Sequence, residues 1–87
     1  MKLLQEEFEH PTQVSRVRLR IFQLPAGLLV TEERRGVTTV FSTLGLFDRR
    51  EAAEARVRER AAQLAAQRYR KVQPAATTRP TAAAPAG

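Results

Sequence analysis

Three arginines alternate with apolar residues in the segment Val14–Leu24, which reads V-S-R-V-R-L-R-I-F-Q-L. Arg16, Arg18 and Arg20 share one side of an extended chain, because successive side chains of a strand point to opposite faces. A guanidinium group matches phosphate oxygens with two parallel hydrogen bonds. On a chain of net charge +6 this ladder predicts an anionic partner. The other interpretation is a solvated outer face of an antiparallel sheet.

A second basic set lies in the later part of the chain. A helix beginning at Asp48 would align Arg49, Arg56 and Arg60 on one flank, with Lys71 at its edge. No acidic residue falls on this flank to neutralise it. The set is therefore a second candidate for ligand contact, and a solvated helix face is the alternative.

Few residues here could carry catalysis or hold a metal. The chain has no cysteine and a single histidine, His10, which lies beside Pro11 in an expected loop. Thiolate and multi-histidine metal sites are thereby excluded, and no glycine-rich phosphate loop is present. We expect no enzyme activity, no catalytic or metal-binding residues and no cofactor.

Three strands are expected to position the arginine ladder. Each is bounded by glycine- or proline-containing turn sequences, Pro25-Ala26-Gly27 and Arg35-Gly36. Their β-branched and alternating composition favours strands. The expected strands are 14–23, 28–34 and 37–44.

Short loops between these strands predict a register. The expected cross-strand pairs include Leu19–Glu32, Ile21–Val30, Arg18–Glu33 and Val30–Phe41. In this register Glu33 partly neutralises Arg18, whereas Arg16 and Arg20 remain unpaired. Phe22 is then the only aromatic residue on the arginine side, which favours contact with a nucleic-acid backbone over base stacking.

A long helix is expected from Asp48 to about Arg70, because this stretch is rich in alanine and lacks glycine and proline. Asp48 and Glu51 form a variant of the capping box. One apolar stripe can cover the sheet; its members are Ala53, Val57, Ala61 and Leu64.

A second helical stripe faces away from the first. Its spacing resembles a helix–helix seam and would support a homodimer or a partner helix; its members are Ala55, Ala62, Ala66 and Tyr69. Alanine used simply as a good helix former is the other interpretation.

The expected fold class is α+β, a three-stranded antiparallel meander packed against one long C-terminal helix in β-β-β-α order. Residues 1–12 are expected to be an arm with a short helix, residues 13–72 a single domain, and residues 73–87 a disordered tail rich in proline, alanine and threonine. No apolar run is long enough to span a membrane. We expect a cytoplasmic protein.

The order of elements resembles the WGR domain, a small nucleic-acid-binding module. The similarity covers about 16–72 and is carried by R-L-R-I-F (18–22), T-E-E-R-R-G-V (31–37), Phe47-Asp48 before the helix, and R-Y-R-K-V (68–72). The chain has no tryptophan, and Arg35 is the residue that aligns with the signature arginine. The resemblance implies a role for Arg35 in binding.

These observations predict a small basic module that contacts the phosphate backbone of nucleic acid, with DNA expected, and that has little sequence specificity. The predicted contacts are Arg16, Arg18, Arg20, Arg35, Arg56, Arg60 and Lys71. A protein-interaction or regulatory module, homodimeric through the alanine stripe, is the alternative function.

Overall fold

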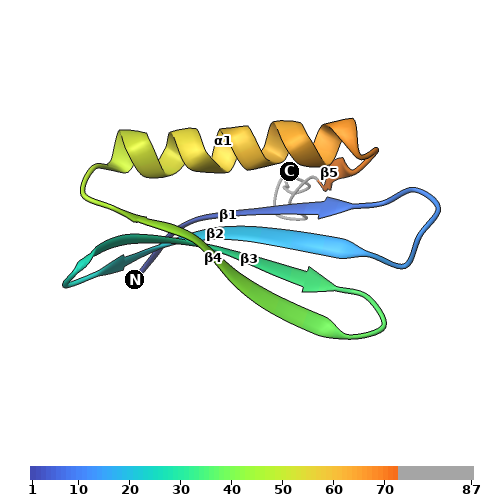
Figure 1. Ribbon diagram of the computed structural model, residues 1–87, viewed down its shortest axis with the longest axis horizontal. Coiled ribbons are helices and arrows are strands. Elements are labelled where there is room, and N and C mark those ends of the chain that lie inside the picture. The colour runs from blue at the N-terminus through green and yellow to red at the C-terminus, as the bar shows by residue number, and fades with distance from the viewer. Residues whose placement is uncertain (73–87) are drawn as a thin grey trace, which may run out of the picture.

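The computed structural model describes residues 1–72, which form a five-stranded antiparallel sheet with one helix on one face (Figure 1). The elements in chain order are β1 (Lys2–Glu9), β2 (Arg16–Leu24), β3 (Gly27–Arg35), β4 (Thr39–Phe47), α1 (Arg50–Ala66) and β5 (Arg70–Val72). The strand order is β4-β3-β2-β1-β5. The α+β class is confirmed, but the predicted three-stranded sheet is wrong. The predicted disordered tail, 73–87, lies outside the described residues.

The first strand that was not predicted is β1, which takes the place of the expected N-terminal arm and its short helix. It pairs with β2 along its length, placing Phe8 opposite Val17 on the face that carries the core. An irregularity between Lys2 and Leu4 shifts the register. Leu3 and Leu4 both pack against the core despite being neighbours, so the segment lacks the regular alternation by which a strand is recognised.

The second strand that was not predicted is β5, which lies close to where the helix was expected to end. The helix instead ends at Ala66, and Arg68 adopts a left-handed conformation with φ 73°. The Tyr69 amide donates to the Leu64 carbonyl at 2.9 Å, and the Arg68 amide donates to the Ala65 carbonyl at 3.0 Å. This pair of bonds is a Schellman motif, which ends a helix and turns the chain back. Residues 70–72 then pair with β1.

The register of β2 against β3 is as predicted, with Ile21 opposite Val30. The turn is tighter than expected and consists of Pro25 and Ala26. Gly27 closes it with φ 141°, and a Cβ there would lie 2.8 Å from the carbonyl oxygen of Phe47.

The register of β3 against β4 differs from the prediction. Phe41 lies opposite Glu33 rather than Val30. The connection occupies residues 36–38 instead of the expected Arg35-Gly36, and this moves Phe41 along β3. Beyond Thr43 an irregularity beside Val30 inserts Leu44 and shifts the rest of β4 further.

The core lies between α1 and one face of the sheet. Ala53, Val57 and Leu64 are buried as the helical stripe predicted, and Ala61 packs at its margin. They cover Leu19 and Ile21 of β2, among other sheet residues. The helix has Arg49 at its N-cap position, with no side-chain capping bond, so the predicted capping role of Asp48 is wrong.

The other face of the sheet carries no helix (Figure 1); we call it the open face. The β1–β2 and β3–β4 connections, the end of α1 and the start of β5 lie at one end of the molecule. Within residues 1–72, no helix has the length and apolarity needed to cross a membrane.

Candidate nucleic-acid interface

The arginine ladder of β2 lies on the open face, as the alternation predicted. Cross-strand pairing puts basic and acidic side chains side by side there. The basic members are Lys2, Arg16, Arg18, Arg20, Arg35 and Arg70, and the acidic members are Glu7, Glu9 and Glu33. The face is therefore basic overall, with its acids interleaved among its arginines.

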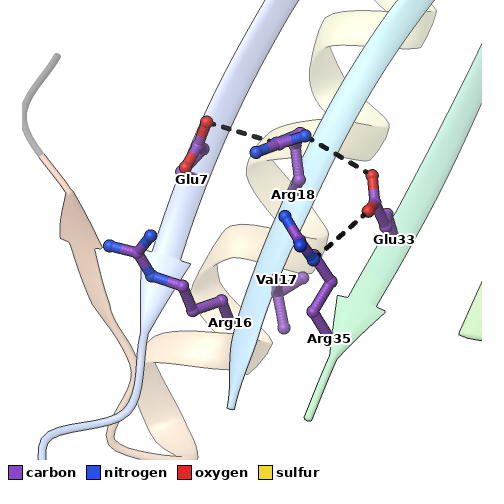
Figure 2. A pocket seen from close by; sticks show the side chains of 6 residues that line it. All are labelled: Glu7, Arg16, Val17, Arg18, Glu33 and Arg35. Atoms are coloured by element: carbon purple, nitrogen blue, oxygen red, sulfur yellow. Dashed lines mark hydrogen bonds and ion pairs between the residues drawn. The ribbon is translucent and has the colours of Figure 1, made fainter. Parts of the chain in front are cut away.

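One carboxylate, that of Glu33, interacts with three guanidinium groups. Its oxygens lie 3.6 Å from Arg18, 3.2 Å from Arg20 and 3.8 Å from Arg35. Figure 2 shows Arg18 between Glu7 and Glu33, and Arg35 directed toward Glu33. The predicted Arg18–Glu33 pair is confirmed. The prediction that Arg20 remains unpaired is wrong, because Arg20 reaches diagonally along β3 to the same acid.

Arg16 and Arg35 are direct cross-strand partners. Each side chain is 57% exposed, compared with 25% for Arg18 and 22% for Arg20. Arg16 forms an ion pair with Glu9 at 3.0 Å, so the prediction that it remains unpaired is also wrong. Both arginines line a shallow pocket with Glu7, Val17, Arg18 and Glu33 (Figure 2).

Arg70 extends this arrangement to the edge of the sheet. It lies opposite Glu9, which in turn lies opposite Arg16. Arg70 has no ion pair within residues 1–72 and is exposed. We call Arg16, Arg35 and Arg70 the arginine row. Arg70 was not among the predicted contacts, because the helix was expected to continue to about this residue. The helix ends at Ala66 instead, and Arg70 begins β5.

The remaining predicted contacts lie away from the open face. Arg56 on α1 pairs with Glu59 at 3.0 Å and donates to the Leu44 carbonyl at 3.4 Å. Lys71 shares the face of Phe8 and pairs with Glu6 at 3.4 Å. The structure therefore separates the seven predicted residues into four on the open face and three on the helix side.

Arg60 is largely buried and pairs with an acid of the sheet instead of facing solvent. Its Nε lies 2.6 Å from Oε1 of Glu32, and the two side chains are only 16% and 8% exposed. Burial alone would raise the pKa of Glu32, but hydrogen bonding and charge from Arg60, with help from Arg34, lower it below its ordinary value of 4.5. The hydrogen bond to Glu32 correspondingly raises the pKa of Arg60.

The predicted alanine seam is broken at Tyr69. Ala55, Ala62 and Ala66 are exposed, whereas Tyr69 is buried with the core. The Tyr69 hydroxyl lies 2.6 Å from the Ser15 hydroxyl, and its ring meets His10 edge-on with centroids 5.3 Å apart. Tyr69 thus joins the end of the helix to the β1–β2 connection.

Phe41 was missed as a candidate site residue, because the predicted register placed it opposite Val30. Its position opposite Glu33 puts it on the open face, where it is 68% exposed. The arginine side of the sheet therefore presents a second aromatic besides Phe22, contrary to the prediction.

No protein-family model, curated protein or solved structure matches this chain. Residues 1–72 contain no cluster of three or more histidine, aspartate or glutamate side chains arranged to hold a metal ion.

Proposed function

We propose that this protein is a small nucleic-acid-binding module that contacts the phosphate backbone through the arginine row. The main support for this proposal is that Arg16 on β2 lies directly opposite Arg35 on β3. Like charges directly opposite each other destabilise a strand pair. Each arginine has its own acid, Glu9 for Arg16 and Glu33 for Arg35, but no ion pair within residues 1–72 bridges the two. A phosphate bound between them would do so and would relieve their repulsion.

The chemistry of the arginine row favours phosphate over a single carboxylate. Guanidinium groups bind phosphate oxygens in bidentate fashion. Arg70 extends the row beyond Glu9, so that successive phosphates of a polymer could be contacted. The resemblance to the WGR domain independently implicates Arg35.

Contacts of this kind carry little information about base sequence. Phosphate contacts set the position of a protein on nucleic acid, whereas reading of sequence requires groups that reach base edges. Three arginines held in one row of a sheet surface are suited to the first task. The proposed specificity is therefore for the backbone.

The test is a salt-dependent binding titration on duplex DNA, comparing the wild type with Arg16→Ala/Arg35→Ala. We expect the log–log salt slope of the double variant to decrease in magnitude by about 1.8, or roughly 0.9 per phosphate contact. Arg58→Ala is the matched control, because Arg58 is exposed on α1 and has no ion pair within residues 1–72. A slope equal to that of the wild type would remove the arginine row from the interface.

The second candidate function is protein interaction through β4. This edge strand has no charged residue from Thr39 to Phe47, and such edges pair readily with other strands. Exposed apolar side chains accompany it, including Val40, Leu46 and the preceding Val37. This observation replaces the alanine seam as the basis for a protein partner.

Sedimentation at several protein concentrations tests that second function for the case of a second copy. Self-association should appear as a mass that increases with concentration and that is abolished by Val40→Lys. A concentration-independent monomer would contradict the homodimer.

A further inference from the structure

We propose that the open face binds single-stranded nucleic acid in preference to duplex, with the ring of Phe41 as a stacking platform for a base. This inference rests on the proposed function, because it needs a phosphate held by the arginine row. It specifies single-stranded nucleic acid as the ligand, which phosphate contacts alone do not distinguish from duplex.

The geometry places the two contacts within one nucleotide of each other. Arg35 lies opposite Thr39, and Phe41 is two residues further along β4 on the same face. Residues in this diagonal relation lie about 7–8 Å apart, within reach of long and aromatic side chains. A nucleotide whose phosphate contacts Arg35 can therefore lay its base against Phe41.

The ring of Phe41 is accessible to such a base. On the open face its neighbours along β4 are the small, exposed Thr39 and Thr43. Within the described residues β4 is an edge of the sheet, so no further strand lies beyond the ring. The opposite neighbour is Glu33, whose carboxylate is already engaged by three arginines.

Stacking on Phe41 selects an unpaired strand. In a duplex both faces of an internal base are covered by its neighbours, whereas a single strand can turn a base onto an aromatic ring. Such stacking is tolerant of sequence, because every base has an aromatic face. The proposed ligand is therefore single-stranded and of mixed sequence.

Phe41 has no structural role that explains it instead. It belongs neither to the core cluster nor to the apolar residues that pack against that cluster. A phenyl ring left 68% exposed beside arginines contributes little to folding. Replacing it should leave the fold intact, which makes the test a clean one.

The experiment measures fluorescence anisotropy of a labelled 12-nucleotide single strand and of the matched duplex, using the full chain. We expect the wild type to bind the single strand more tightly. Phe41→Ala should weaken binding of the single strand about tenfold and leave the duplex within twofold, while Phe41→Tyr should retain the wild-type affinity. Val40→Ala is the matched control, since Val40 is exposed on the same strand but on the other face.

The outcomes separate this inference from the proposed function. If Phe41→Ala weakens neither ligand, or both equally, the stacking role is overturned, while the salt-slope test of Arg16 and Arg35 still decides phosphate binding. If the wild type binds neither ligand, the proposed function falls and the stacking role with it. If Phe41→Ala instead dissociates a dimer in sedimentation without changing affinity, Phe41 serves a second copy of the chain and the inference is wrong.

Discussion

The Nε–H of Arg60 on α1 donates to Oε1 of Glu32 on β3 across 2.6 Å, inside the layer between helix and sheet. A second guanidinium contact, from Arg60 Nη2 to the other oxygen at 3.2 Å, makes the interaction bidentate. The pair therefore anchors the helix to the sheet by a directional contact within an otherwise apolar layer.

Removing only one partner of this pair should be costly. Arg60→Met leaves a buried carboxylate whose nearest remaining cation is Arg34 at 3.4 Å, and we expect the free energy of unfolding to fall by about 3 kcal/mol. Chemical denaturation measures it. Arg58→Met, on the exposed side of α1, should change stability by less than about 0.5 kcal/mol.

The double variant Glu32→Leu/Arg60→Leu should recover most of that loss, because no unpaired charge remains buried. A double variant as unstable as Arg60→Met would contradict this account.

Stability should also depend on acid through Glu32. The folded state holds the pKa of this carboxyl below 4.5, so the unfolded chain binds the proton more readily. The stabilisation is therefore complete above about pH 4.5 and is lost as the pH falls through the lowered pKa of the folded state. Thermal unfolding from pH 7 downward measures it, and Glu32→Gln should flatten the acid limb of the curve.

The Schellman motif predicts a stabilising substitution. Arg68 occupies the left-handed position that glycine prefers, and an L side chain there costs about 1–2 kcal/mol. We expect Arg68→Gly to raise the free energy of unfolding by about 1 kcal/mol. Arg58→Gly in the middle of α1 is the control and should lower it by a similar amount. A loss of stability in Arg68→Gly would show that the Arg68 side chain makes a compensating contact.

Because Arg16 and Arg35 lie opposite each other, removing one of them should raise stability while weakening the binding of nucleic acid. Arg35→Thr removes a like-charge cross-strand pair and should raise the free energy of unfolding by about 0.5 kcal/mol, while lowering affinity for nucleic acid. Arg20→Thr is the comparison, because each variant loses an ion pair with Glu33 but Arg20 lies opposite Thr31, so that no repulsion is relieved. Equal stability changes in the two variants would argue against strain at Arg16 and Arg35.

The parts of the fold that could be predicted from the sequence are those set by local pattern. The alternation of β2 and the short turn before Gly27 suffice to place Ile21 opposite Val30 and Arg18 opposite Glu33. The spacing of Ala53, Val57 and Leu64 likewise identifies the buried side of α1. Each of these depends on residues close together in the chain.

The parts that could not be predicted depend on irregularities and on distant partners. The strand β1 is irregular near Leu4, and the β3–β4 connection over residues 36–38 is longer than the expected turn at Arg35-Gly36, so that Phe41 changes face. Glu32 is buried on the apolar face of the sheet, and its partner there is Arg60, which lies 28 residues further along the chain. Such long-range pairing leaves no local signal.

The position of β5 beside β1 has a consequence for how the chain folds. These neighbours are the first and the last strands of residues 1–72, and the Lys71–Glu6 pair spans 65 residues. Closing so long a loop is slow relative to forming hairpins. On the ribosome, the β2–β3 hairpin can form early, but the β5 side of β1 stays unpaired until Val72 has emerged. We expect refolding to show a late step that reports on β5, and synthesis stalled within α1 to leave that strand edge open to aggregation.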